Sequence, residues 1–179
     1  HDDVEWKVGW RKLQKVWGEK DKFRLATHPA GTLTVAAIAD VLDRWETVDK
    51  WVPDMVVIDY ADILAPPPGR MESREAIDKN WMMLRSLSTA RHILVVTASQ
   101  TDADSYDVEI ITKGNFSGSK TKNAHVTAMI AINQTPAEKD QGLYRLSLPA
   151  ARESALSEST CVYVAGCLGI ASPFMLSIF

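Results

Sequence analysis

The sequence predicts an α/β fold: a mostly parallel sheet with helices on both faces and additional strands toward the C-terminal end. The first observation is order, because from residue 23 to residue 100 short apolar runs of strand type alternate with longer stretches of helical periodicity. The second is that two of these runs end directly on polar residues, as buried parallel strands do. The third is length, since 179 residues suffice for one domain with a substantial core.

Composition indicates an ordinary folded protein rather than a disordered one. Hydrophobic residues make up 46% and charged residues 24% of the chain, and the formal net charge is −3. This charge gives no general attraction to nucleic acid or to anionic membranes, so contact with a polyanion requires local basic clusters. Cys161 and Cys167 lack the further ligands of a zinc site. We expect both thiols to be reduced and, because no signal peptide is recognised, the protein to be cytoplasmic.

The first part of the chain contains three predicted helices and a short strand. An N-terminal helix is predicted by apolar residues at spacings of four, three and four, namely Trp6, Trp10, Leu13 and Trp17. Residues 23–26 read as a strand. Thr34 is a candidate N-cap of a second helix, whose buried face is expected to contain Ile38, Val41, Leu42, Trp45 and Val48. A third helix is predicted over 72–89, with Trp81 on its inward face.

Two apolar runs end on polar residues that suit phosphate chemistry. The first is residues 55–58 followed by Asp59, in the stretch VVIDYAD, and we expect it to be buried on both faces. The second is ILVVTASQ, which ends on Gln100. At the carboxyl edge of a parallel sheet, Asp59 would hold a magnesium ion and Gln100 would contact a terminal phosphate or its attacking water. The alternative is that both side chains merely cap the ends of their strands.

A phosphate-binding loop is the next feature that such a site requires. The nearest match to GxxxxGK[ST] is GNFSGSKT, which begins at Gly114 and contains Lys120, but Ser119 stands where the second glycine belongs. The following segment HVTAMIAI is rich in β-branched residues and reads as a strand, not as the helix that a phosphate loop needs. We therefore predict that this match is a decoy.

Residues 102–123 lack periodicity, and a polar loop of this length is generally functional. Its second half contains Lys113, Lys120 and Lys122 among asparagine and serine residues, a composition that suits the phosphates of a nucleic acid. Arg70 ends PPPGR, a stiff loop expected at the functional edge of the sheet, and is a further candidate for contact with nucleic acid. A solvated charged loop without a partner is the alternative.

The last third of the chain is predicted to add strands at 126–132, 144–148 and 162–165, with PAEKDQG as a turn. Consecutive short strands extend a sheet by antiparallel or mixed pairing. Glycine, proline and serine break the apolar tail over 161–179 into strand-sized pieces, so we expect buried strands and no membrane span. Arg152 follows the second of these strands. In isolation it is a surface arginine, whereas in a ring-shaped ATPase it could reach a neighbouring subunit's γ-phosphate.

Together, these segments resemble a known family. The resemblance is to the ATPase domain of hexameric replicative DNA helicases of the DnaB type, especially phage-like versions, within the RecA-like P-loop ATPases. It covers residues 23–179 and is carried by HPAGTLTVAAIADVL, VVIDYADIL, ILVVTASQT, HVTAMIAINQT and YRLSLPAARE. It implies ATP and Mg²⁺ as cofactors, single-stranded DNA as a partner, a homo-oligomer that forms a hexameric ring, and primase as a further candidate partner.

The resemblance also implies roles by position. Asp59 matches the family's magnesium-side aspartate, Gln100 its γ-phosphate sensor and Arg152 its arginine finger. The family often has a lysine two residues before the finger, where this chain has Ala150. Residues 102–123 occupy the place of the family's DNA loop in the central channel.

In this family the phosphate-binding loop and the catalytic glutamate lie upstream of the helix with which this chain starts. The resemblance therefore implies that residues 1–179 are one partial RecA-like ATPase domain, without its first strand and P-loop, from a longer protein. We expect the isolated chain not to hydrolyse ATP. Two alternatives stay open: a RecA-like recombinase or regulator, and a catalytically inert module for nucleic-acid binding or assembly.

Overall fold

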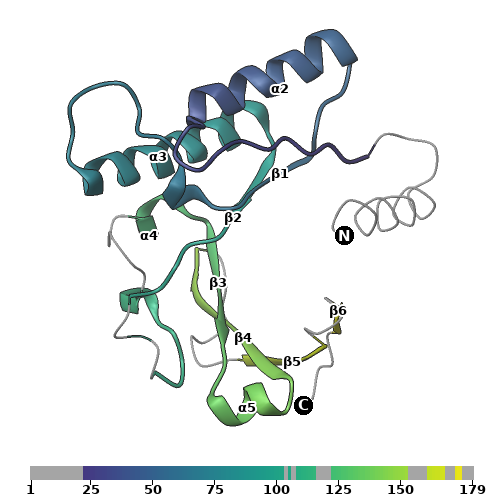
Figure 1. The fold of residues 1–179 in the computed structure, drawn as a ribbon, viewed down its shortest axis with the longest axis vertical. Coiled ribbons are helices and arrows are strands. Elements are labelled where there is room, and N and C mark those ends of the chain that lie inside the picture. The colour runs from purple at the N-terminus through teal and green to yellow at the C-terminus, as the bar shows by residue number, and fades with distance from the viewer. Residues whose placement is uncertain are drawn as a thin grey trace.

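The computed structural model describes residues 22–102, 105, 108–115, 122–152, 161–167 and 172–174. The predicted helix with the tryptophan stripe, and Lys120, lie outside these residues. Two short 3₁₀ turns, η1 (Ala61–Ile63) and η3 (Lys113–Asn115), accompany the following elements, which Figure 1 shows in order: α2 (Val35–Asp49), β1 (Met55–Ile58), α3 (Ser73–Arg91), β2 (Leu94–Thr97), α4 (Lys122–His125), β3 (Ala128–Asn133), α5 (Pro136–Asp140), β4 (Leu143–Ala151), β5 (Cys161–Cys167) and β6 (Ser172–Phe174).

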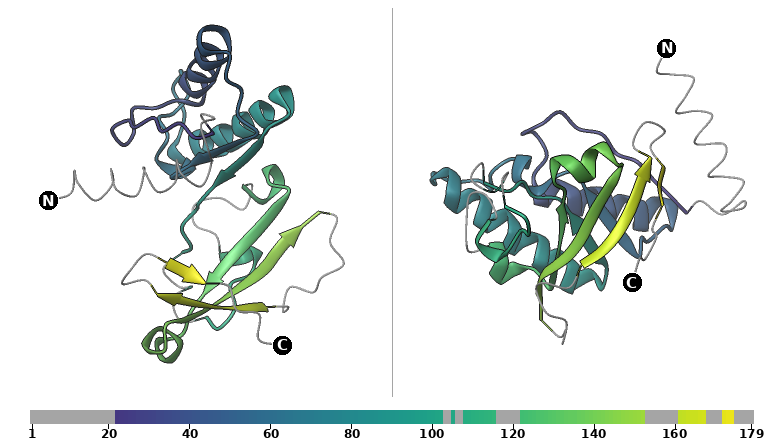
Figure 2. Two further views of the ribbon diagram at one scale, coloured as in Figure 1. Left: turned by 90° about the vertical axis from the view of Figure 1, so that its right-hand side faces the viewer. Right: turned by 90° about the horizontal axis from the view of Figure 1, so that it is seen from below.

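The strands form two separate sheets among the described residues. β1 and β2 pair in parallel, with Met55 opposite Leu94 and Ile58 opposite Thr97. β3, β4, β5 and β6 form an antiparallel sheet in that order. The left-hand view of Figure 2 shows this sheet at one end of the molecule and α2, α3 and the parallel pair at the other. The late strands therefore pair antiparallel, as predicted, but with one another and not with the parallel pair.

An apolar core joins α2 and α3 to the parallel pair. α2 begins as predicted, because the hydroxyl oxygen of Thr34 accepts a hydrogen bond from the N–H of Ala37 at 3.1 Å. Of the expected inward face of α2, Val48 is instead 68% exposed. Burial of apolar surface is the dominant favourable contribution to this half of the molecule. The buried residues of the core are Val35, Ile38, Leu42, Ile58, Ala61, Trp81, Leu84, Leu87 and Ile93.

The two faces of the parallel pair differ in burial. Side chains alternate along a strand, and Ile58 faces the core whereas Met55 and Val57 are 51% and 68% exposed. Leu94 and Val96 of β2 are exposed as well. The prediction that β1 is buried on both faces is therefore wrong for the described part of the chain, where α2 and α3 cover only one face.

Two further segments differ from their predictions. Residues 23–26 are not a strand, and Leu25 is 74% exposed, because this segment lines a groove and does not pair with β1. PAEKDQG contains the helix α5 rather than only a turn. Its N-terminus is a capping box, in which the Thr135 N–H donates to the Glu138 carboxylate at 2.7 Å and the Glu138 N–H donates to the Thr135 hydroxyl at 3.3 Å. The sequence TPAE, with proline at the first helical position, was the signal for it.

Candidate functional site

The ends of β1 and β2 lie side by side because the two strands are parallel and in register. Thr97 connects them: its hydroxyl donates to the Ile58 carbonyl and accepts from the Ala61 N–H, each at 2.9 Å. Asp59 follows β1 directly, and Gln100 lies just beyond the end of β2. The fold thus brings these two predicted residues to the same edge of the sheet, where ligands of open α/β sheets bind.

The side chains of Asp59 and Gln100 are exposed, and neither has a hydrogen-bond partner among the residues that the structure describes. No group of three or more His, Cys, Asp or Glu side chains in the described ranges is placed to hold a metal ion. Mg²⁺ usually takes one or two protein carboxylates and completes its octahedron with water and phosphate oxygens. A single free carboxylate at Asp59 therefore fits a Mg²⁺ ion that arrives with a nucleotide.

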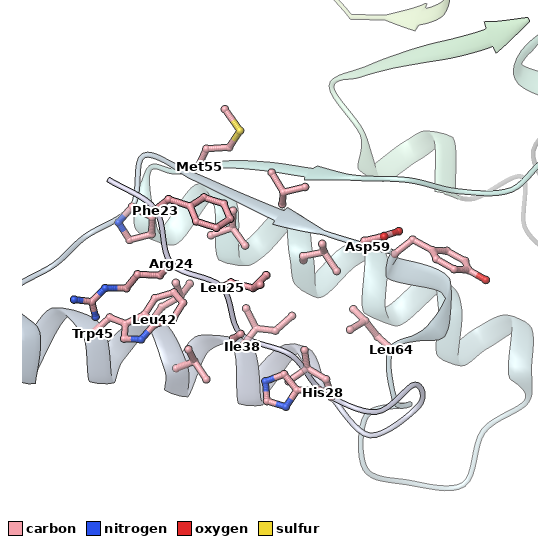
Figure 3. A pocket seen from close by; sticks show the side chains of 18 of the residues that line it. Phe23, Arg24, Leu25, His28, Ile38, Leu42, Trp45, Met55, Asp59 and Leu64 are labelled. Atoms are coloured by element: carbon pink, nitrogen blue, oxygen red, sulfur yellow. The ribbon is translucent and has the colours of Figure 1, made fainter. Parts of the chain in front are cut away.

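A groove of about 1100 Å³ lies between residues 22–31, α2 and β1, and Asp59 stands at one end of it (Figure 3). At the other end the Arg24 guanidinium lies over the rings of Trp45 and Trp51, 5.6 and 5.0 Å from their centroids. Much of the wall between these ends is apolar and includes Leu25, Ile38, Leu42, Met55 and Leu64. Such a lining offers few donors to a phosphate group, so the groove does not supply a phosphate cradle.

A second acidic residue, Asp62, lies in η1 and faces the interior. One of its carboxylate oxygens accepts from the Trp81 indole N–H at 3.0 Å. The other accepts from the Ser99 hydroxyl at 2.9 Å and from the Lys122 ammonium at 2.8 Å. The ammonium also donates to the Ser99 hydroxyl at 3.1 Å and lies 5.6 Å from the centroid of the Trp81 ring. We refer to Asp62, Trp81, Ser99 and Lys122 as the Asp62 cluster.

The Asp62 cluster corrects one prediction. Lys122 was expected to contact nucleic-acid phosphates, but it is only 1% exposed and forms an ion pair with Asp62. A buried ammonium that already has a carboxylate partner presents no free face to a phosphate, so this assignment does not hold in the structure. Sequence reasoning missed the cluster because Asp62 and Lys122 are 60 positions apart and no local pattern connects them.

The other predicted basic residues differ in their surroundings. Lys113 and Arg70 are exposed, whereas Lys120 lies outside the described residues. Arg152 rests on the backbone of its own chain. Its guanidinium donates to the carbonyls of Val126 at 3.0 Å and Ala124 at 2.5 Å, next to α4.

The partial phosphate-loop match GNFSGSKT begins in η3 and extends beyond the described residues. It is followed by the four-residue helix α4 and then by β3 (Ala128–Asn133). The prediction that HVTAMIAI contains a strand is therefore confirmed. A phosphate-binding loop leads into a helix whose N-terminus faces the phosphates, and α4 is too short for that arrangement.

Comparison with known proteins identifies the fold. No protein-family model and no curated protein matches this sequence. Among solved structures, the chain is similar to the ATPase domain of a DnaB-like replicative helicase, with a TM-score of 0.74 and 14% identity over 94% of this chain and 60% of that one. It has the fold of DnaB-like ATPase domains. A second DnaB-like replicative helicase, solved in a study of its interactions with primase, matches with a TM-score of 0.68 and 15% identity over 87% of this chain and 39% of that one.

The chain therefore has an α/β, RecA-like fold, as the sequence predicted. It covers 60% of the first of these two structures and 39% of the second. No described helix combines the length and the apolar composition that a membrane span needs. Part of the apolar tail instead forms β5 and β6 of the antiparallel sheet.

Proposed function

We propose that this chain is the C-terminal part of the ATPase domain of a ring-shaped replicative DNA helicase of the DnaB type. Such an enzyme couples ATP hydrolysis to translocation along single-stranded DNA and to unwinding of the duplex. The observation that carries the proposal is the fold shared with DnaB-like ATPase domains, combined with Asp59 and Gln100 at the joined ends of two parallel strands. This edge is where open α/β sheets bind their ligands.

In the proposed enzyme, Asp59 holds the Mg²⁺ of a bound Mg–ATP, directly or through water. Gln100 contacts the γ-phosphate or orients the attacking water, because its amide both donates and accepts hydrogen bonds. When bound, Mg²⁺ neutralises charge on the β- and γ-phosphate oxygens. Both side chains are exposed and have no competing partner in the described ranges, which supports these roles. The phosphate cradle and the catalytic base come from a segment upstream of this chain, so the isolated chain binds and hydrolyses ATP poorly or not at all.

Arg152 is the proposed arginine finger, which acts on the nucleotide of a neighbouring subunit in a hexameric ring. Its position at the end of β4 supports this role, and its two bonds to backbone carbonyls describe the guanidinium before it reaches a phosphate. Lys113 and Arg70 are exposed and serve the proposed contact with single-stranded DNA, together with Lys120. Primase is a proposed partner, since one structural neighbour was solved in connection with primase.

The test is ATP hydrolysis by the full-length natural protein that contains this chain, with and without poly(dT). We expect single-stranded DNA to stimulate hydrolysis, and Asp59→Asn to lower kcat by roughly a hundredfold, because a charge that orients the metal ion is removed. The matched control is Asp54→Asn, an exposed aspartate just before the opposite end of β1, which should retain wild-type activity.

Two results would contradict the proposal. Equal activity of the Asp59→Asn and wild-type proteins would remove Asp59 from the site. A full-length protein that binds poly(dT) but hydrolyses no ATP would instead indicate the inert nucleic-acid-binding module that the sequence leaves open.

A further inference from the structure

The short helix α4 is bonded to parts of the molecule that are far apart in sequence. Its first residue, Lys122, is held by Asp62 and Ser99 at the ends of the parallel strands, at 2.8 and 3.1 Å. Its last residue, His125, is held by α3, because the Arg85 guanidinium donates to the His125 carbonyl at 3.2 Å. Figure 1 shows α4 between the helical half of the molecule and the antiparallel sheet. α4 is therefore the junction between the two halves.

Arg152 makes the remaining contact with this junction. Its Nη2 donates to the Ala124 carbonyl, within α4, and its Nε donates to the Val126 carbonyl directly after α4. These carbonyls lie at the C-terminal end of the helix, where backbone oxygens are unpaired and a cation is favoured. The guanidinium of Arg152 is thus positioned by α4, so a displacement of α4 displaces Arg152.

The ion pair at the other end of α4 has one well-defined geometry. The side chains of Lys122 and Asp62 are only 2% and 15% exposed. Desolvating two charges costs about as much as their attraction returns, so a buried pair contributes little net stability relative to apolar residues of the same size. Removing one partner, by contrast, leaves an uncompensated charge, which holds the two groups together. Such a pair specifies position more than it stabilises the fold.

The Asp62 cluster is also next to both proposed nucleotide-binding residues. Asp62 lies three residues after Asp59, and Ser99 directly precedes Gln100. A movement of either strand end upon nucleotide binding is therefore transmitted to the carboxylate or the hydroxyl that holds Lys122. From Lys122 the connection continues through α4 to Arg152, entirely by bonds between described residues.

We propose that Lys122 is a positioning residue that couples the nucleotide site at Asp59 and Gln100 to the placement of Arg152. Lys122 contacts no substrate in this scheme. It fixes α4 to the strand ends, and α4 holds the arginine that would act on the neighbouring subunit's nucleotide. The proposal rests on the proposed function, because it gives Arg152 a task only in a ring-shaped ATPase.

The experiment measures steady-state ATP hydrolysis by the full-length natural protein with saturating poly(dT). Lys122→Met is expected to lower kcat by about tenfold, since a displaced arginine stabilises the transition state less well. The KM for ATP should stay within about twofold of wild type, because Asp59 and Gln100 are untouched. Lys122→Arg keeps the charge and should recover most of the activity. Lys139→Met, at an exposed lysine of α5, is the matched control and should behave as wild type.

A double variant separates positioning from folding. Lys122→Met alone leaves Asp62 without its cation, whereas Asp62→Asn combined with Lys122→Met removes both charges and should restore the melting temperature to near the wild-type value. We expect kcat of the double variant to remain about tenfold low, because the connection is still broken. Recovery of both stability and kcat would overturn the proposal and leave the pair a purely structural role.

The two proposals fail in different ways. If the wild-type protein shows ATPase activity stimulated by poly(dT) and Lys122→Met has the same kcat, the coupling is wrong and the proposed function stands. If the wild-type protein hydrolyses no ATP, the proposed function fails and the coupling fails with it. A rise in KM without a fall in kcat would also overturn the coupling, because it would place Lys122 in nucleotide binding.

Discussion

Two aspartates that follow the same strand mark two regions with opposite properties. Asp59 lies at the open edge of the parallel pair, where it is exposed and has no partner among the described residues. Asp62, one 3₁₀ turn later, faces inward and accepts from Trp81, Ser99 and Lys122. The difference teaches that acidic residues next to one candidate site divide by their partners. A carboxylate without protein donors is available to a ligand, and one that is saturated with donors positions the structure around it.

The largest effect that would sharpen this comparison is on stability. Asp62→Asn should lower the free energy of unfolding by about 3–5 kcal/mol, because it leaves the buried Lys122 ammonium without its counter-charge. Asp59→Asn should change it by less than about 0.5 kcal/mol, since that carboxylate is exposed and unpaired. Urea unfolding followed by circular dichroism measures both variants. Equal losses for the two would break the comparison.

An intermediate effect concerns a third carboxylate, Glu138, which also has protein partners. The hydrogen bond from the Thr135 backbone N–H lowers the pKa of Glu138 below its usual value of 4.5, burial opposes this shift, and Arg145 adds to the lowering. The folded pKa is thus below the unfolded one. Glu138 therefore contributes stability that is present above about pH 4.5 and is lost as the pH falls through the folded pKa.

Glu138→Gln keeps a side-chain acceptor in the capping box but removes the charge that pairs with Arg145 at 2.7 Å. We expect it to lower the free energy of unfolding at neutral pH by about 1–2 kcal/mol, and to lose less stability than wild type on acidification below pH 4.5. Urea unfolding at several pH values tests this, with Asp40→Asn, an exposed aspartate of α2, as the control. Parallel pH curves for wild type and Glu138→Gln would contradict the assignment.

The smallest expected effect is at Ser99. Ser99→Ala removes one of the three donors to Asp62 but leaves the ion pair with Lys122 and the bond from Trp81 in place. The loss of one hydrogen bond should cost about 1 kcal/mol in the free energy of unfolding. If Ser99→Ala were as damaging as Asp62→Asn, the hydroxyl and not the ion pair would hold the cluster together.

Much of the first half of the fold could be predicted from local patterns. The helical spacing of apolar residues placed α2 and α3, and Thr34 marked the first residue of α2 because its side chain caps the helix locally. The position of Asp59 and Gln100 at one sheet edge followed from two apolar runs separated by a helix. By contrast, α5 was missed although TPAE is a local capping signal, because proline and glycine in PAEKDQG suggested a turn.

The sequence alone determined the elements whose causes lie within a few residues: the helical stripes, the N-cap at Thr34 and the polar ends of the two parallel strands. Only the tertiary structure decided which charges meet. Lys122 reads as a basic loop residue in sequence, yet it pairs with Asp62, 60 positions away, and Arg152 rests on carbonyls beside the same helix. The reason is physical: burial and ion pairing depend on how distant segments cross in space, which local periodicity does not encode.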